Sequence, residues 1–428
     1  MTRRLNSTDK SFAADFDALL NSRNQSEEDV AQKVKTIIAD VRARGDDALV
    51  ELTNKFDHAN VTLETLRLKP AELEGSIPKD QYAAIETAAF RIEAYHRKQL
   101  PEDLQFKDDV GAELGWRWTA VDSVGLYVPG GTASYPSSVL MNAIPARVAG
   151  VARIVMVTPA SGGKINPLVL AAARRAGISE IYRIGGAQAV AALAYGTKTI
   201  APVDKIVGPG NAWVAAAKRE VFGQVGIDSI AGPSEILVIA DAANNPDWIA
   251  ADLLSQAEHD ASSQSILITD DAGFADKVAE AATRLLATLP RKDIATKSWN
   301  DHAGIIVVKS FDEACALSDR VAPEHLEIAT ADPKALLAKV RHAGAIFLGP
   351  NTPEAMGDYI AGPNHVLPTS RSARFSSGLS VLDFMKRTTL LSLNSAAINA
   401  LGPDAITLAD AEGLQAHARS IAARLNKT

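Results

Sequence analysis

Short apolar runs rich in β-branched residues alternate with helix-patterned segments through the middle of the chain. Strands are predicted at 152–159, 180–186, 205–208, 235–241 and 265–271, with others at 304–310, 326–330 and 345–350. The intervening segments with helical patterns are 166–177, 187–196, 211–223 and 245–259. Continuous apolar strands separated by helices of this length indicate parallel sheets that are covered on both faces. The predicted fold class is therefore α/β.

Start signals and periodicity place several helices more closely. Asn166-Pro167 and Asn245-Pro246 each combine an N-cap residue with proline at the first helical position. The chain up to about residue 100 is charged and helical in pattern. At the other end, apolar residues recur at helical spacing and predict one amphipathic helix over 408–425.

Composition limits the classes of protein that the chain can belong to. With 428 residues, 47% hydrophobic and 22% charged, it can form two or more domains. A formal net charge of −7 without long runs of like charge argues against nucleic-acid binding. The chain shows no secretory signal pattern and no apolar run of the roughly 20 residues that a bilayer requires.

The chain contains one cysteine, Cys315, which excludes an intramolecular disulfide framework. Together with the absence of a signal pattern, this predicts a cytoplasmic protein. Cys315 lies in DEACALSDR, which has the pattern of an amphipathic helix. A buried, inert thiol is therefore favoured over a nucleophile.

Some of the eight histidines have neighbours that suggest a metal site. Gln256 and His259 are three residues apart near the end of the predicted 245–259 helix, so both side chains can reach one ion. That spacing alone is more typical of capping or solvated contacts. Asp358, His365 and His417 are further candidates elsewhere in the chain.

Glu324 and His325 follow a proline and precede a short predicted strand. Loops at the ends of strands commonly carry catalytic groups in α/β proteins. Adjacent side chains project in different directions, so one can face a water molecule while the other faces a substrate hydroxyl. From these residues alone, an ordinary exposed loop pair is the favoured alternative.

Four segments together closely resemble the motifs of histidinol dehydrogenases: AGPSE at 231–235, SQAEH at 255–259, APEHLE at 322–327 and GPNHVLPT at 362–369. The resemblance covers nearly the whole chain and is strongest from about 120 to 385. It implies an NAD-dependent four-electron dehydrogenase that oxidises L-histidinol to L-histidine through histidinaldehyde, reducing two NAD⁺, the last step of histidine biosynthesis.

The resemblance also assigns site residues. SQAEH, MGDY and QAHAR resemble the segments that supply the family's zinc ligands, which implies one Zn²⁺ per subunit bound by Gln256, His259, Asp358 and His417. Oxygen and nitrogen ligands without a thiolate would also suit Mn²⁺ or Co²⁺. His325 is implied as the general base and Glu324 as the group that activates water. The residues implied to complete the substrate site are Ser234, His365 and Glu412.

Three small-residue turns join a predicted strand to a helix, at 126–138, 184–189 and 207–213. Such turns let backbone amides approach a pyrophosphate, although they also occur as ordinary tight turns. No G-x-G-x-x-G fingerprint follows a strand. The family resemblance implies that Tyr127, Gln188 and Asn211 contact NAD⁺.

The family architecture implies two Rossmann-like parallel-sheet domains, one inserted in the other. The expected first domain is 24–126 with 234–380, the inserted NAD-binding domain is 127–233, and small helical segments span 1–23 and 381–428. The C-terminal segment is expected to exchange between the subunits of a homodimer, which would share their active sites. Two rival functions are a metal-dependent hydrolase that uses Glu324 as base and a non-catalytic solute-binding protein.

Overall fold

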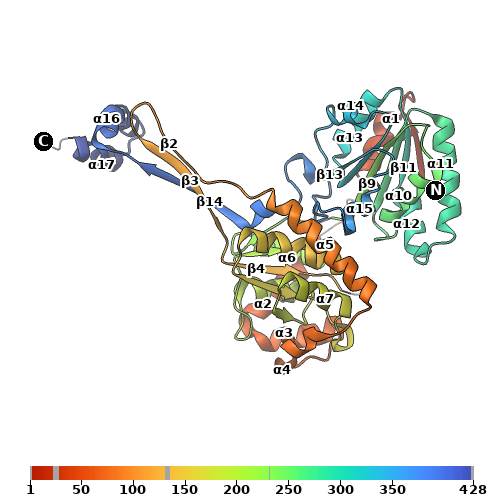
Figure 1. Cartoon of the computed structure of the whole chain (residues 1–428), viewed down its shortest axis with the longest axis horizontal. Coiled ribbons are helices and arrows are strands. Elements are labelled where there is room, and N and C mark those ends of the chain that lie inside the picture. The colour runs from red at the N-terminus through yellow and green to blue at the C-terminus, as the bar shows by residue number, and fades with distance from the viewer. Residues whose placement is uncertain (1, 23–27, 131–134, 231, 426–428) are drawn as a thin grey trace.

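The computed structural model describes residues 2–22, 28–130, 135–230 and 232–425. Two α/β units each surround a parallel sheet, and an extended arm projects away from them to the C-terminus (Figure 1). The expected α/β class with two parallel-sheet domains is confirmed.

The first unit surrounds a six-stranded sheet of order β1-β11-β10-β9-β12-β13, in which every pairing is parallel. Its strands are β1 Arg3–Asn6, β9 Glu235–Ala240, β10 Gln264–Thr269, β11 Gly304–Val307, β12 His325–Ala329 and β13 Ala345–Leu348. Helices α10 Pro246–Ala257, α11 Ala272–Leu286 and α12 Lys292–His302 pack in one apolar core; α1 Phe12–Leu20, α13 Phe311–Val321 and α14 Pro333–Leu337 pack in the other. Because both faces are covered, β9 and β10 are buried along their whole length.

The second unit surrounds a five-stranded parallel sheet of order β6-β5-β4-β7-β8. Its strands are β4 Ser123–Tyr127, β5 Arg153–Val157, β6 Glu180–Tyr182, β7 Lys205–Val207 and β8 Gly226–Ile227. Helices α5 Lys79–Arg97, α6 Pro136–Ala149 and α7 Pro167–Ala176 share one core with this sheet; α2 Glu28–Arg44, α3 Asp46–Asp57, α8 Gly186–Tyr195 and α9 Ala212–Val221 share another. Strand order reverses between β4 and β7, which creates a topological switch point at their carboxyl ends.

The arm is a three-stranded antiparallel sheet that carries two helices at its far end (Figure 1). It consists of β2 Leu104–Lys107, β3 Glu113–Ala120 and β14 Met385–Ser392, followed by α16 Ser395–Ala411 and α17 Gln415–Leu425. These strands were not predicted from the sequence, because β2 is exposed along its whole length and β14 along most of it, so burial imposes no apolar pattern on them.

The predicted central strands and helices are confirmed within a few residues, and Asn166 and Asn245 cap α7 and α10 with their side chains. The prediction of a single helix over 408–425 was wrong. The chain instead breaks between α16 and α17 at Gly413, whose φ of +74° is the left-handed conformation that ends helices. The N-terminal segment is also not purely helical, since β1 pairs with β11.

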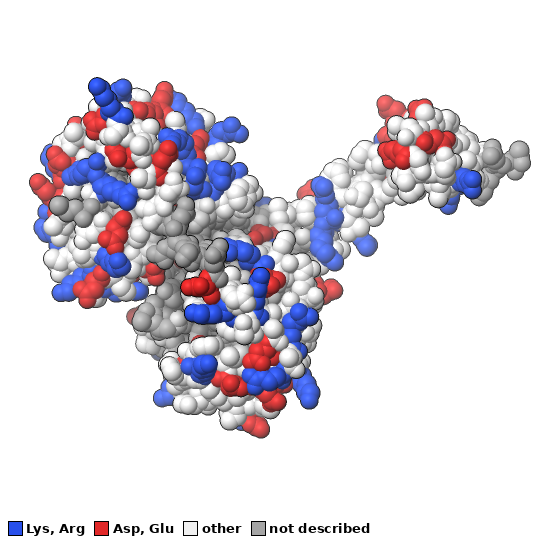
Figure 2. Space-filling view, turned by 180° about the vertical axis from the view of Figure 1, so that it is seen from behind, with Lys and Arg blue, Asp and Glu red and all other residues white. Residues whose placement is uncertain are grey.

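Helices α2, α3 and α5 lie against the five-stranded sheet, whereas residues 234–348 supply most of the six-stranded sheet. The proposed domain boundaries stay a prediction. Among the described helices, none is long and apolar enough to cross a membrane. Acidic and basic side chains are intermixed on the face of the two α/β units that Figure 2 shows.

Candidate active site

Glu324 and His325 lie at the amino end of β12, beside the amino end of β9. His325 is the first residue of β12 and pairs in register with Ile236 of β9. Both side chains are buried, with 6% of Glu324 and 3% of His325 exposed. The exposed loop pair that the residues alone favoured is therefore wrong, because β12 lies between two neighbouring strands.

Glu235, the first residue of β9, contacts both members of this pair. Its backbone N–H donates to Oε2 of Glu324 at 2.9 Å, and its backbone oxygen lies 2.9 Å from Nδ1 of His325. A carbonyl oxygen can only accept, so Nδ1 carries the proton in that hydrogen bond. The other ring nitrogen, Nε2, is thereby left to face the rest of the site.

Acidic side chains surround Nε2 of His325. Nε2 lies 3.6 Å from Oδ1 of Asp358 and 4.0 Å from Oε2 of Glu354. Both acids belong to α15 Glu354–Tyr359 and are four residues apart, so they share one face of the helix. One potential ligand atom from each of the three residues lies within 4.8 Å of the other two. This spacing allows one metal ion to be held between them.

Several buried polar atoms around this cluster have no hydrogen-bond partner within the described part of the chain. They are Oε1 of Gln256, Nε2 of His325 and Oε2 of Glu354. Unsatisfied buried polar atoms are costly, and three that belong to one cluster indicate a place for a ligand. The predicted ligand Gln256 is in contact with His325: Nε2 of Gln256 lies 3.2 Å from Nδ1 of His325.

His259 lies in the turn just after α10, because the helix ends at Ala257 and the His259 N–H bonds the Gln256 carbonyl. Burial lowers the pKa of His259, and the charge of nearby Asp358 opposes that shift. The structure thus brings together three of the four predicted metal ligands, Gln256, His259 and Asp358. Glu354 and His325 are additional candidate ligands in the same cluster.

The charges of the cluster dominate its protonation. Burial would lower the pKa of His325, but Glu324, Asp358 and Glu354 together raise it to about 10. Burial raises the pKa of Glu324 to about 8, against the opposing effect of His325. The protein alone therefore favours a cation at this position.

The remaining predicted substrate residues fall into two groups. Ser234 directly precedes β9, and His365 lies beside Asp358, with Nδ1 donating to the Asp358 carbonyl at 3.0 Å. Nε2 of His365 is 3.3 Å from Oγ of Ser138 on α6, which connects this loop to the second unit. Glu412 and His417, by contrast, are exposed on the helices at the far end of the arm (Figure 1). Within one chain they do not join the cluster.

The three predicted cofactor residues lie at the carboxyl edge of the five-stranded sheet. Tyr127 ends β4, and its hydroxyl accepts the Gly186 N–H at 3.0 Å, which ties β4 to the start of α8. Gln188 is 1% exposed, and its Nε2 has no partner among the described residues. Asn211 caps α9, accepting from the N–H groups of Trp213 and Val214. Part of the 126–138 turn, residues 131–134, lies outside the described residues, as does Ala231 of the AGPSE motif.

Glu235 and Glu354 were not selected by sequence reasoning. The spacing of Glu354 and Asp358 in PEAMGDY, four residues apart, was the available signal for Glu354. Glu235 lies in AGPSE, but its contact with Glu324 depends on the pairing of β9 with β12, which the sequence does not reveal. Cys315 is buried in α13, as predicted, and burial raises the pKa of its thiol.

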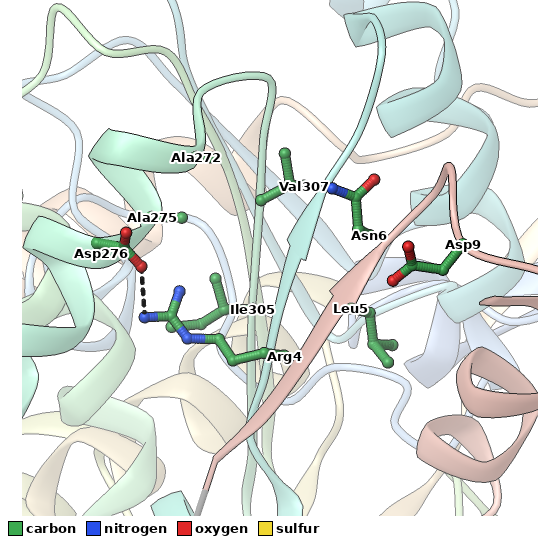
Figure 3. Close-up of a pocket in the computed structure, with 9 residues that line it drawn as sticks. All are labelled: Arg4, Leu5, Asn6, Asp9, Ala272, Ala275, Asp276, Ile305 and Val307. Carbon is green, nitrogen blue, oxygen red and sulfur yellow. Dashed lines mark hydrogen bonds and ion pairs between the residues drawn. The ribbon is translucent and has the colours of Figure 1, made fainter. Parts of the chain in front are cut away.

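A separate surface hollow of about 260 Å³ lies between edge strand β1 and α11 (Figure 3). Its polar side chains include the exposed ion pair between Arg4 and Asp276, at 3.1 Å. Exposed pairs of this kind contribute little binding or stability. The candidate site is therefore the buried cluster and not this hollow.

The chain combines two features: a buried histidine–glutamate pair beside an acidic cluster in one unit, and a doubly wound sheet with small-residue turns at its switch point in the other. Together these features define a two-domain α/β enzyme. The family model for histidinol dehydrogenase matches residues 20–425. The chain is 63% identical over 431 residues to a histidinol dehydrogenase of Rhodospirillum rubrum, covering 100% of this chain and 99% of the relative. A histidinol dehydrogenase of Rhizobium meliloti is 62% identical over 429 residues, with coverage of 100% and 99%.

The crystal structure of histidinol dehydrogenase from Elizabethkingia anophelis matches with a TM-score of 0.94 and 37% identity, covering 99% of this chain and 98% of that chain. The chain belongs to the histidinol dehydrogenase family. The family resemblance inferred from the motifs is confirmed, and so is the enzyme class, an NAD-dependent dehydrogenase. The hydrolase and solute-binding alternatives find no support in these comparisons.

Proposed function

We propose that the protein oxidises L-histidinol to L-histidine through histidinaldehyde, the last step of histidine biosynthesis. The observation that carries the proposal is the buried Glu324–His325 pair, which Glu235 holds in one orientation. Each of the two oxidations transfers one hydride to NAD⁺. The first requires a base for the substrate hydroxyl, and the second requires water to add to the aldehyde.

His325 is the base that we assign to the hydroxyl proton. Its Nδ1 proton is committed to the Glu235 carbonyl, so Nε2 is the nitrogen that can take up a proton once a bound metal cation offsets the acidic charges that raise the pKa of His325. Glu324 is the group that we assign to the water. Its Oε2 is 3.6 Å from Nδ1 of His325, so the two side chains lie side by side at the amino end of β12.

The metal site that we propose uses Gln256, His259 and Asp358 from one chain and His417 from its partner. Oε1 of Gln256, which has no hydrogen-bond partner among the described residues, and the acidic surroundings of His325 fit a divalent cation. Zn²⁺ is the ion implied by the family, and its ligand types here are nitrogen and oxygen. When bound, the ion supplies positive charge that anchors the substrate nitrogens. Ser234, His365 and the partner's Glu412 complete the substrate site in this proposal.

The NAD⁺ site that we propose is the switch point of the five-stranded sheet. Ligands of doubly wound sheets bind outside the carboxyl ends of the strands where the strand order reverses, here β4 and β7. The buried Nε2 of Gln188, which has no partner within the described part of the chain, fits a cofactor oxygen, and the amide N–H₂ of Asn211 can donate in the same way. The Tyr127 hydroxyl, which accepts the Gly186 N–H, connects the end of β4 to the turn before α8.

A homodimer with shared active sites is proposed from the arm. Its strands and helices expose large apolar side chains, which a second copy can cover. These side chains are Leu104, Phe106, Val110, Leu391, Leu393, Leu401, Leu408 and Leu414. The same proposal explains why His417 and Glu412 lie away from their own chain's cluster.

A reducing, cytoplasmic location is proposed from the single buried cysteine.

The test is an assay of purified protein with L-histidinol and NAD⁺, before and after treatment with a chelator and after restoring Zn²⁺. Two NADH formed per histidinol, lost with the chelator and regained with metal, would support the function. Elemental analysis of His259→Asn tests the metal site itself, because an amide replaces a strong nitrogen ligand. Full metal retention in that variant would remove His259 from the ligand set.

A further inference from the structure

A buried ion pair fixes the turn that follows β7. Lys218 on α9 and Asp228 next to β8 are ion-paired, and their side chains are only 2% and 4% exposed. Oδ2 of Asp228 accepts the Gly208 N–H at 2.8 Å, and Nζ of Lys218 donates to the Gly208 carbonyl oxygen at 3.1 Å. The pair thus satisfies both backbone polar groups of one glycine.

Gly208 sits at the junction of the two strands that form the switch point. Its φ is +113°, and a Cβ at this position would lie 2.1 Å from the Tyr127 carbonyl oxygen. Glycine is therefore required, and the turn after β7 packs directly on the end of β4. Any movement of the Gly208 peptide would shift the 208–211 turn relative to Tyr127.

Burying an ion pair at this position costs free energy. Taking two charges out of water carries a large desolvation penalty, and apolar side chains of similar size often stabilise a fold as well or better. Apolar side chains could not, however, bond both the N–H and the carbonyl of Gly208. The ion pair therefore fixes the conformation of this turn, which apolar packing would not do.

The turn leads directly into Asn211. Oδ1 of Asn211 is committed to the start of α9 through Trp213 and Val214, so the direction of its N–H₂ group follows from the position of the turn. Lys218 belongs to the same helix, two turns further along. The ion pair therefore connects α9, the turn after β7 and the residue that follows β8 in one arrangement around Asn211.

We propose that Lys218 and Asp228 are positioning residues for the dinucleotide: they hold the Gly208 peptide so that the 208–211 turn is preformed at the switch point. The inference rests on the proposed NAD⁺ site. A preformed turn loses less conformational freedom on binding than a mobile one, so the ion pair acts on cofactor affinity without touching the cofactor.

The test is NAD⁺ binding to Lys218→Met and Asp228→Asn, measured by titration calorimetry on the full-length, metal-loaded protein. The expected result is a Kd for NAD⁺ raised about tenfold or more, with histidinol affinity and metal content unchanged. The matched control is Glu180→Gln. Glu180 pairs with Arg153 at the amino ends of β5 and β6, in the same unit but at the opposite edge of the sheet. This variant should lower the unfolding temperature without changing the Kd for NAD⁺.

If either single variant does not fold, the double variant Lys218→Met/Asp228→Leu removes both charges together and keeps an apolar core. Unchanged NAD⁺ affinity in a folded variant would overturn the inference. Gln188→Ala and Asn211→Ala separate this failure from that of the proposed site. If those two variants weaken NAD⁺ binding while the ion-pair variants do not, only the positioning role is wrong. If none of them does, the cofactor binds elsewhere and both proposals are wrong.

Discussion

Glu235 and Glu324 exchange two hydrogen bonds across the amino ends of β9 and β12. The Glu235 N–H donates to Oε2 of Glu324 at 2.9 Å, and the Glu324 N–H donates to Oε2 of Glu235 at 3.2 Å. The second oxygen of Glu235, Oε1, accepts the Ser370 N–H at 3.0 Å. The Glu235 carboxylate thus accepts from two backbone donors, and it also connects Glu324 to the segment that follows the His365 loop.

Glu235→Gln is expected to lower the rate of acid formation by roughly 10- to 100-fold, the range that one hydrogen bond to a charged group can supply. An amide offers one acceptor oxygen, so its N–H₂ would face one of the two backbone donors. The affinity for histidinol should change little. Steady-state kinetics with histidinol and with the aldehyde check the expectation.

The matched control for Glu235 is Asp241→Asn at the opposite ends of the same two strands. Oδ1 of Asp241 accepts the Ala243 N–H and Oδ2 accepts the Ala331 N–H, so this carboxylate also serves two backbone donors. Asp241→Asn should reduce thermal stability without a selective loss of acid formation. Similar kinetic defects in both variants would mean that Glu235 acts only on stability.

Glu324→Gln and His325→Asn are expected to separate the two oxidations, because the two residues are assigned to different protons. Supplied with the aldehyde, Glu324→Gln should form acid very slowly, on the order of 10²- to 10⁴-fold below wild type. It should keep more of the first oxidation than His325→Asn does. Equal losses in every partial reaction would contradict this division of roles.

The sequence predicted the sheets because their strands are buried on both faces and read as continuous apolar runs, such as EILVIA of β9. It did not predict the arm strands, whose exposed positions are not set by burial. It also joined α16 and α17, since the apolar spacing around Leu414 continues across the turn at Gly413.

The site shows a similar division. Glu324, His325 and the segments around Gln256 and Asp358 were found through motifs, and the structure places those side chains together. Burial of the Glu324–His325 pair and the contacts of Glu235 depend on the β9–β12 pairing, which joins residues about 90 positions apart. Local patterns carry no information on such pairing.

His96 should make the stability of the protein depend on pH. The ring is fully buried on α5; its Nδ1 donates to the Ile92 carbonyl at 2.7 Å, and Nε2 lies 3.3 Å from the donor Nδ2 of Asn364. Burial lowers the pKa of His96 below its usual value of 6.5. As the pH falls below about 6.5, the unfolded chain therefore takes up a proton that the folded protein resists, and the free energy of unfolding decreases.

Urea unfolding of wild type and His96→Gln at about pH 7.5 and pH 5.5 measures this contribution of His96. Wild type should lose more stability between the two pH values than the variant, because the variant lacks the titrating ring. The other histidines are common to both proteins and cancel in the comparison. An equal loss in both proteins would show that His96 titrates alike in the folded and unfolded states.

The last prediction concerns assembly and follows from the position of His417. The residue is exposed on α17 at the far end of the arm, away from the Glu324–His325 pair at the amino ends of β9 and β12 (Figure 1). If the arm reaches into a partner, each active site combines the cluster of one chain with the helical tail of the other, and each chain gives what it receives. Two inactive variants, His325→Asn and His417→Asn, should then complement each other.

When the two variants are unfolded and refolded as an equimolar mixture, about half of the dimers should contain one chain of each. Each mixed dimer has one site made from the intact cluster of the His417→Asn chain and the intact tail of the His325→Asn chain. Roughly a quarter of wild-type activity should therefore return, because half of the dimers have one working site of two. A site formed within one chain gives no rescue, since neither variant has both residues intact. An inactive mixture, with mixed dimers demonstrated by a size tag on one variant, would defeat the shared-site proposal and leave His417 without a role at the metal.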